Sequence, residues 1–347
     1  MNHKTKLPLN IADKYISLFK KKEYYKLPPL RVKVLKRVFV NHWGIVLKRF
    51  VIPFKSAENL IGSYDQTFYW IHWKKVIEQF LVSKFGKSLP FIKLDAKEEY
   101  FTIHTPWFGY FSWLTTYVPK LLSVIEKHPN AILLVPEEWN KIMYVRDTLD
   151  MFPNLKMKGL PKDHHVFVEK FIFAENRPWT SIFYPEQIHQ VRGVFFSQIA
   201  GVKLKPVARL YVSRRKANRR KIVNELELLD YLKSQGFKEI CFEDYSIAEQ
   251  VFLMKNAEYL VSMHGAGLTN VMFMNPLTSV LEITPIVEKD SQFRFPFWRI
   301  SSILDINYYV QFSTTVNNGE TDLYSRNIEV DIPELKMNIE LMLNIKA

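Results

Sequence analysis

The second half of the chain repeats one hydrophobic pattern several times. Short apolar runs alternate with longer segments whose apolar residues recur at helical spacing. We interpret the apolar runs as strands at 209–213, 239–242, 258–263 and 279–283, and the longer segments as helices at 222–232, at 247–256 and from 271 onward. This order of strands and helices predicts a parallel, doubly wound α/β domain.

Residues at the ends of two of these helices support the assignment. Ser246 and Glu249 have the spacing of a capping box, which satisfies backbone groups at the start of a helix. Asn224 could cap the start of the helix predicted at 222–232. Gly236 stands just after that helix, where a C-terminus favours glycine.

The turn between the third strand and the third helix has the sequence His-Gly-Ala-Gly-Leu-Thr-Asn, residues 264–270. Glycines let a backbone approach an anion and adopt positive φ. The start of a helix offers free N–H groups and the positive end of its dipole. We therefore expect phosphate to bind at this turn; the alternative is a tight turn in which glycine serves packing alone.

Four polar residues fall at the carboxyl ends of the predicted strands, namely Arg214, Glu243, His264 and Glu282. Open parallel sheets bind ligands beyond the carboxyl ends of their strands. This coincidence is the main physical argument for a binding site in the second half.

The first half predicts a second α/β unit with extra strands at its N-terminal side. Strands are expected at 32–40, 44–52, 99–104, 131–135 and 165–173, and helices at 113–125, 139–149 and 187–200. We expect residues 1–200 to form one domain and residues 201–347 another, with the last segment packing back on the first domain. The stretch 201–206 is the best candidate for a linker.

Several of these motifs together resemble glycosyltransferase family 61, the capsular polysaccharide biosynthesis or DUF563 group. The resemblance rests on Tyr-Val-Ser-Arg-Arg at 211–215 with Asn-Glu at 224–225, Phe-Glu-Asp-Tyr-Ser at 242–246, and residues 263–270. It covers roughly residues 205–285, and the string at 264–270 is quite specific. It implies a GT-B fold, in which two Rossmann-like domains face a cleft, together with an inverting mechanism and a nucleotide-sugar donor, commonly a UDP-sugar.

The implied enzyme is a hexosyl-, pentosyl- or N-acetylhexosaminyl-transferase. Its acceptor would be a glycan or a lipid-linked saccharide in the assembly of capsular polysaccharide or lipopolysaccharide. Two other hypotheses stay open: a catalytically silent relative that acts as a binding subunit, and a basic nucleic-acid-binding protein. Steep salt-dependent binding to DNA or RNA, without binding of nucleoside diphosphates, would support the last.

The donor site predicted in this way draws on three segments. Arginines could clamp a diphosphate, His264 could contact phosphate or sugar, and Glu243 or Glu282 could bind ribose or base. Each residue also has a non-functional alternative. The arginines could be solvated charges of a loop, His264 could be structural, and Glu243 or Glu282 could be a helix-capping or surface carboxylate. The predicted donor-binding residues are Arg214, Arg215, Arg219, Glu243, His264, Gly265, Ala266, Gly267, Leu268, Thr269, Asn270 and Glu282.

Residues 109–122 resemble the acceptor-side motif of the same family, with departures. Ser112 stands where His is usual, Thr116 where Asp or Glu is usual, and Lys120 where Arg is usual. Neither Ser nor Thr can take an acceptor proton unaided at neutral pH. His104 is therefore our first candidate for the catalytic base. Weaker alternatives for the base are Asp65, His72 and Glu137, and the predicted acceptor-side residues are Trp107, Ser112, Trp113 and Thr116, of which Trp113 could equally be a core residue.

No Asp-x-Asp occurs in the chain. This sequence typically holds a metal-bound diphosphate in the other major glycosyltransferase architecture, so we expect no metal site and no cofactor. Arginines, backbone amides and the helix dipole would hold the diphosphate instead.

Composition adds a hypothesis about location. The formal net charge is +13, and basic residues gather at 14–49 and 214–221. A single cysteine, no apparent signal peptide and no apolar stretch long enough to span a bilayer are consistent with the cytoplasm. We expect a cytoplasmic protein that binds the anionic inner face of the plasma membrane peripherally; solvated surface charge and nucleic-acid binding are the alternatives.

Overall fold

The computed structural model describes residues 2–48, 91–105, 108–162, 164–175, 177, 181–287 and 290–344. Its contacts divide the chain into two compact units. Unit 1 comprises Met1–Leu27 and Phe183–Ala347, and unit 2 comprises Pro28–Ile182. Both units are mixed α/β, as the sequence predicts.

The core of unit 1 is a six-stranded sheet with the strand order β11-β10-β12-β13-β14-β15. The first five strands are parallel, and only β15 pairs antiparallel, with β14. Their bounds are β10 Arg209–Val212, β11 Lys238–Ile240, β12 Tyr259–Met263, β13 Ser279–Pro285, β14 Asn307–Val316 and β15 Asn327–Glu329. The predicted parallel sheet is confirmed for its first four strands.

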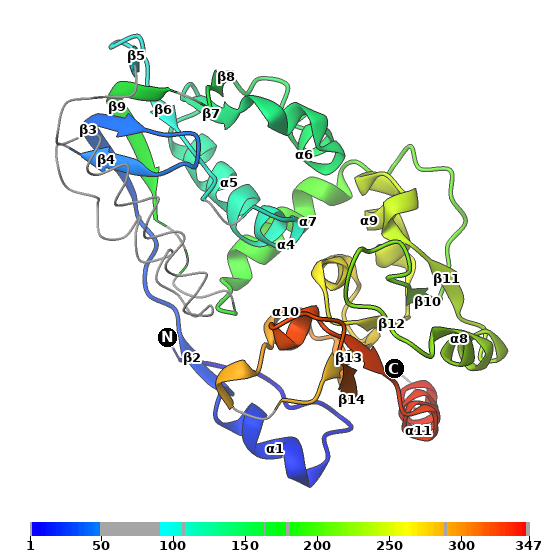
Figure 1. The fold of residues 1–347 in the computed structure, drawn as a ribbon. Helices are drawn as coiled ribbons and strands as arrows, with labels where there is room; N and C mark the ends of the chain where they lie inside the picture. The colour runs from blue at the N-terminus through cyan, green and yellow to red at the C-terminus, as the bar shows by residue number, and fades with distance from the viewer. Residues whose placement is uncertain are drawn as a thin grey trace. The chain divides into compact units, whose positions relative to one another are not determined.

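Helices cover the sheet of unit 1 (Figure 1). They are α7 Pro185–Phe196, α8 Glu225–Ser234, α9 Ile247–Asn256, α10 Pro296–Ile303 and α11 Ile332–Asn344. Side chains alternate between the two faces of a strand. Tyr211, Val261 and Leu281 therefore share one face, and there they join a core with α8 and α11. Ser262 and Glu282 belong to the opposite face, where the 3-10 helix that follows β12 packs against α9 and α10.

Two of the three predicted helix-end signals hold. Ser246 and Glu249 form the capping box: the Glu249 N–H donates to Ser246 Oγ, and the Ser246 N–H donates to the Glu249 carboxylate over 2.8 Å. Gly236 follows α8 with φ of +77°, which favours glycine. Asn224 occupies the cap position, but its side chain bonds the backbone of Val330 instead and so joins α8 to the chain after β15.

The N-terminal segment belongs to unit 1. It contains β1 Asn2–Lys4, α1 Asp13–Lys20 and β2 Tyr24–Lys26. Phe19 of α1 is fully buried, with its ring 4.8 Å from that of Phe293 and 4.9 Å from that of Trp298. Asn10 exchanges hydrogen bonds with the backbone of Val310 in β14. The long-range packing of an N-terminal segment leaves no periodic signal in the sequence, so we did not predict it.

The expectation that the last segment packs back on the first domain stays a prediction, although Asn338 of the last helix accepts a hydrogen bond from Asn10 over 2.8 Å. The last helix, α11, packs against β14 and α8 within unit 1. Along the chain, the boundary between the two units lies near residue 183 and not near 200. Helix α7 belongs to unit 1 because it packs against α9 and the 3-10 helix after β12.

Unit 2 contains a seven-stranded mixed sheet. Its path is β4-β3-β9-β6-β7-β8, with β5 also pairing with β9. The antiparallel strands β3 and β4 are the expected extra N-terminal hairpin, and β3 also pairs antiparallel with β9. The pairs β5–β9, β6–β9, β6–β7 and β7–β8 are parallel. The bounds are β3 Val32–Val40, β4 Val46–Lys48, β5 Phe91–Lys93, β6 Tyr100–Phe101, β7 Ile132–Pro136, β8 Met157–Leu160 and β9 His165–Ala174.

The helices of unit 2 match the predicted ones, with one local difference. α4 Tyr110–Ser112 continues through a π-helical turn, Trp113–Tyr117, into α5 Val118–Lys127, and α6 spans Met143–Leu149. Single π-turns inside helices occur frequently at functional sites. This turn falls on the acceptor-side motif.

No helix in the described part of the chain is long and apolar enough to cross a membrane.

Candidate functional site

The chain leaves β12 at Met263 and enters the stretch His264–Asn270, which we call the glycine turn. The helix that follows is a 3-10 helix, Ala266–Phe273, and not the expected α-helix. It ends before Pro276, so it is short and its dipole is correspondingly small. Gly265 has φ of 171°, which is extended backbone, and Gly267 does not have positive φ either. The glycines are therefore not needed for an unusual backbone conformation. They let neighbouring side chains pack close to the backbone of the turn.

Ala266 and Gly267 are the partly exposed residues of the glycine turn. Leu268, Thr269 and Asn270 are at most 1% exposed. Asn270 Nδ2 donates to Gln250 Oε1 over 2.9 Å, which ties the turn to α9. The predicted binding roles of these three residues are thus not supported by their placement: they anchor the turn from inside.

Gly265 lies directly against the guanidinium of Arg214. A Cβ atom at position 265 would overlap Arg214 Nη1 and Cζ. Position 267 is different, because a Cβ there would meet Phe242 Cδ2 at 3.3 Å. Absence of a side chain at 265 is thus what brings an arginine to the backbone of the glycine turn.

The loop after β10 holds Arg214 in this position. Arg214 Nε donates to the carbonyl oxygen of Arg220 over 3.1 Å, and Nη2 donates to that of Arg219 over 3.4 Å. Arg220 itself has φ of 62°, in the left-handed region that few non-glycine residues adopt. The loop is therefore folded around the Arg214 side chain.

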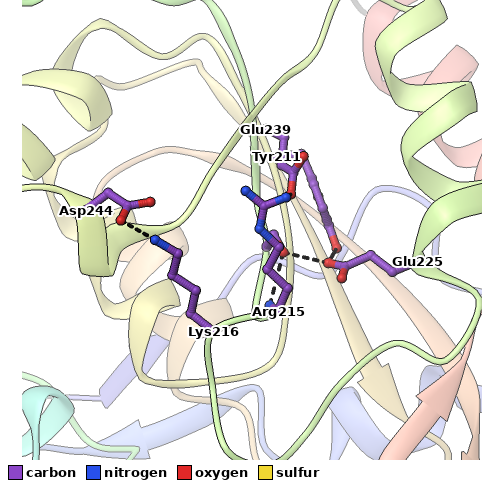
Figure 2. A network of polar contacts seen from close by, with 7 residues as sticks. Tyr211, Arg215, Lys216, Glu225, Glu239 and Asp244 are labelled. Atoms are coloured by element: carbon purple, nitrogen blue, oxygen red, sulfur yellow. Dashed lines mark hydrogen bonds and ion pairs between the residues drawn. The ribbon is translucent and has the colours of Figure 1, made fainter.

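A partly buried carboxylate, that of Glu225, fixes the base of the same loop (Figure 2). Glu225 Oε1 accepts hydrogen bonds from Tyr211 Oη over 2.6 Å and from Ser213 Oγ over 2.7 Å. Ser213 Oγ in turn accepts from the backbone N–H of Arg215 over 3.1 Å. This network explains physically why tyrosine, serine and glutamate occur at these positions of the motif.

Arg215 and Lys216 are used elsewhere. Figure 2 shows Arg215 directed toward Glu239 of β11, at 2.9 Å, and Lys216 toward Asp244. Both basic side chains are more than 40% exposed. Arg215 therefore forms an ion pair with β11, and its predicted contact with a diphosphate stays a prediction.

Four arginines instead gather near the glycine turn, and we call them the arginine cluster: Arg214, Arg219, Arg220 and Arg294. Burial, together with the charges of the other three arginines, lowers the pKa of Arg220 to about 10, while Asp322 opposes the shift. Burial likewise lowers the pKa of Arg214, and the nearby Glu243 opposes it.

The cluster retains unused capacity for an anion. Arg294 pairs with Asp322 over 2.7 Å, but Arg220 Nε is buried without a hydrogen-bond partner among the described residues. Buried like charges repel one another, so an anion that entered would be bound by both charge and hydrogen bonds.

His264 sits beside the cluster in a buried network. Its Nδ1 pairs with Glu282 Oε1, and Glu282 Oε2 accepts from Tyr308 Oη over 2.6 Å. Burial lowers the pKa of His264, as do the charges of Arg220 and Arg294, while Glu282 opposes them. With Nδ1 donating to a carboxylate, Nε2 of the neutral ring is an acceptor, and protonation would turn it into a donor.

Glu282 is placed inside the fold, and its predicted contact with ribose or base stays a prediction. Glu282 is 1% exposed, and both carboxylate oxygens are used by His264 and Tyr308. Its role is to orient His264. Glu243, by contrast, is exposed at the end of β11, where its charge acts on Arg214, so its contact with a nucleotide stays a prediction.

The acceptor-side residues lie in unit 2. Trp113 is fully buried, and its Nε1 donates to Thr148 Oγ1 over 3.0 Å, so it is a core residue. Ser112 is half-buried. Thr116 Oγ1 accepts from Arg177 Nε over 3.0 Å, which places an arginine opposite the position where the family motif has a carboxylate. Trp107, Asp65 and His72 lie outside the described residues.

His104 is poorly suited to be the catalytic base. It is 3% exposed, and its Nε2 donates to the carbonyl oxygen of His42 over 3.0 Å. Burial lowers its pKa to about 3, and the charge of Lys120 contributes. Its remaining nitrogen, Nδ1, is buried without a hydrogen-bond partner among the described residues. A group with so low a pKa is a weak base at neutral pH.

Lys120 differs from an ordinary lysine. It is buried, and burial lowers its pKa to about 7. An arginine, which the family motif has here, would stay charged in the same place.

Sequence reasoning missed Arg220 and Arg294 as parts of the arginine cluster. Arg220 lies within the recognised motif, so its position beside Arg219 was a usable signal. Arg294 comes from a segment outside that motif, and only the tertiary structure brings it to the cluster.

Within the described ranges, no three His, Cys, Asp or Glu side chains group so that they could hold a metal ion.

The family comparison agrees with this geometry. The family model described as glycosyltransferase 61 matches residues 110–281, which include both the π-helical turn and the glycine turn. The chain belongs to glycosyltransferase family 61.

Characterised relatives match parts of the chain. Over 80 residues it is 32% identical to the EGF domain-specific O-linked N-acetylglucosamine transferase of Gallus gallus, covering 22% of this chain and 15% of the relative. Over 108 residues it is 32% identical to the protein O-linked-mannose beta-1,4-N-acetylglucosaminyltransferase 2 of Bos taurus, covering 29% and 18%. The chain thus matches less than a fifth of the length of these relatives.

We predict that Gly265→Ala weakens binding of inorganic pyrophosphate and UDP by about 10- to 150-fold. The new Cβ would displace the Arg214 guanidinium, and a hydrogen bond to a charged group contributes about 1.5–3 kcal/mol. Gly267→Ala is the matched control and should lose less, because its Cβ meets only the edge of Phe242. Calorimetry on both variants measures the difference. Equal affinities in the wild type and Gly265→Ala would contradict the proposed contact.

Proposed function

We propose that the protein is an inverting glycosyltransferase whose nucleotide-sugar donor, a UDP-sugar, binds at the arginine cluster and the glycine turn. The observation that carries this proposal is the position of Arg214. Its guanidinium lies on the side-chain-free backbone of Gly265, with Arg219, Arg220 and Arg294 near enough for their charges to interact. Such a concentration of cationic donors suits a diphosphate.

The chemistry needed at this site is stabilisation of the leaving group. When the bond between the anomeric carbon and the diphosphate breaks, negative charge develops on the diphosphate oxygen. Arg214 is already held by the carbonyl oxygens of Arg219 and Arg220, so it would meet that charge without reorganising. His264, oriented by Glu282, would donate to the same anion from Nε2 when its ring is protonated.

The GT-B arrangement of the two units is part of the proposal. Two α/β units with parallel strands support it. In that arrangement unit 1 binds the donor and unit 2 provides the acceptor side, which contains the π-helical turn of the family motif.

For the substrates, we propose a glycan or lipid-linked saccharide acceptor in surface-polysaccharide assembly. The names of the relatives from Gallus gallus and Bos taurus refer to transfer of N-acetylglucosamine. UDP-N-acetylglucosamine is therefore the first donor to test, followed by other UDP-hexoses and UDP-pentoses.

Arg214→Ala should lower turnover by about 30- to 1000-fold. Loss of one preorganised contact to developing charge costs about 2–4 kcal/mol in the transition state. Arg215→Ala is the matched control: Arg215 neighbours Arg214 in the chain but pairs with Glu239. Steady-state donor consumption by both variants distinguishes them. Near-normal turnover in Arg214→Ala combined with a large loss in Arg215→Ala would reverse our assignment.

Transfer should continue in excess EDTA. We propose that the arginine cluster neutralises the diphosphate, a task that a divalent metal performs in other glycosyltransferases. Initial rates are compared after chelation and after readdition of manganese or magnesium. Loss of activity with EDTA and recovery with either metal would refute this phosphate chemistry.

A further inference from the structure

A half-exposed carboxylate of unit 2 is held by a buried histidine. Glu138 follows β7 in a short 3-10 helix, Glu137–Lys141, at the carboxyl end of that parallel strand. Its Oε1 lies 2.7 Å from His42 Nε2, and the exposed fractions of the two side chains are 51% and 6%. Glu138 Oε2 has no hydrogen-bond partner among the described residues. One oxygen is thus fixed by the protein, and the other is available to a ligand.

The turn of the β3–β4 hairpin fixes His42 firmly. Asn41 Oδ1 accepts from the backbone N–H groups of Trp43, over 3.0 Å, and Ile45, over 2.9 Å. Gly44 has φ of +71° and packs directly on the backbone of His104, where a side chain would not fit. The carbonyl oxygen of His42 accepts from His104 Nε2. His104 therefore supports the residue that positions Glu138.

Both ring nitrogens of His42 face oxygen acceptors. Nε2 faces the Glu138 carboxylate, and Nδ1 lies 3.5 Å from the carbonyl oxygen of Leu160. An ionised carboxylate accepts hydrogen bonds and cannot donate them, so Nε2 must carry a proton. The ring is thus a donor that orients the carboxylate.

An aromatic surface borders the same carboxylate. Trp139, next to Glu138 in the chain, is buried, and the Phe108 ring lies against it with centroids 4.8 Å apart. Phe108 is 39% exposed, and Trp43, next to His42, is 37% exposed. Sugar rings present apolar C–H patches that pack on aromatic faces. The surface is therefore suited to a pyranose.

We propose that Glu138 is the catalytic base of the transfer and that a pyranose of the acceptor packs on Phe108 beside it. This inference rests on the proposed function. The acceptor hydroxyl oxygen forms a bond to the anomeric carbon of the donor while the bond to the diphosphate breaks. The hydroxyl proton passes to Glu138, and the bonding electron pair leaves with the diphosphate. Glu138 then releases its proton to solvent.

The other nearby groups fit this role less well. Thr116 has no basic form at neutral pH, and it is bonded to Arg177. His104 is buried with a pKa near 3, and Lys120 is buried behind it. Glu137, also exposed, lies over Gly159, where a Cβ would come within 3.0 Å of its Cγ. Among the described residues, Glu137 is the neighbouring carboxylate that competes with Glu138 for the role.

The test compares four full-length proteins: wild type, Glu138→Gln, Glu137→Gln and Glu126→Gln. Glu126→Gln is the matched control, a carboxylate on the exposed end of α5. Each is assayed for consumption of UDP-N-acetylglucosamine, UDP-glucose and UDP-xylose with an array of aryl glycosides as acceptors. UDP binding is measured by calorimetry in parallel. Glutamine keeps an oxygen for His42 but cannot take the proton.

We expect Glu138→Gln to lower kcat by about 100- to 10,000-fold with UDP affinity unchanged, and the other two variants to resemble the wild type. The wild-type rate should fall on the acid side as the base protonates, and Glu138→Gln should lose this dependence. Wild-type kcat in Glu138→Gln, or a loss confined to Glu137→Gln, would overturn the assignment.

Two further outcomes are also decisive. If Glu138→Gln fails to fold, Glu138→Asp replaces it: the shorter carboxylate should lower kcat by about 10- to 100-fold and keep the acid-side dependence, and unchanged kcat overturns the inference. If the wild type neither binds UDP nor consumes any of the three donors, the proposed function itself fails, and the inference fails with it.

Discussion

The proposed donor site depends on one close approach, that of the Arg214 guanidinium to the backbone at Gly265. The loop 214–220 folds around this side chain, because two of its carbonyl oxygens accept from the guanidinium. The same loop is fixed at its base by Glu225, through Ser213 and Tyr211. A side chain at position 265 would displace the guanidinium, so an arginine at 214 requires a glycine at 265. The two residues follow different strands, β10 and β12, which are neighbours in the sheet.

The consequence of this packing is a concentration of positive charge that the described residues balance only in part. Burial and mutual repulsion lower the pKa of Arg220, and Asp322 pairs with Arg294 alone. Proteins retain arrangements of this kind where a ligand supplies the missing charge. His264 extends the same surface, with its ring oriented from behind by Glu282 and Tyr308. In unit 2 the analogous element is again a histidine and a carboxylate, but there the carboxylate is the exposed partner.

Hydrophobic periodicity was sufficient to predict the parallel sheet of unit 1, its first helices and the hairpin of unit 2, because these elements depend on local pattern. The motif residues 211–215 and 264–270 come together in the fold, as predicted from their positions after parallel strands. Contacts between distant segments could not be predicted: the packing of Phe19 on Trp298, and the arrival of Arg294 at the cluster, depend on tertiary structure. The roles assigned to Glu282 and His104 stay predictions. The hydrophobic pattern predicts a strand end at both positions, but each side chain is buried, and burial is not visible in residue type or spacing.

Hydrogen–deuterium exchange of the full chain, with and without UDP, tests the central claim most directly. Our account predicts slower amide exchange on UDP binding in two segments, 214–220 and 264–267, because the diphosphate would lie on the loop of Arg214 and on the first residues of the glycine turn. The N-terminal segment 2–27 serves as an internal reference that should not change. Protection confined to the acceptor-side residues 110–127, with both donor segments exchanging as before, would contradict the account.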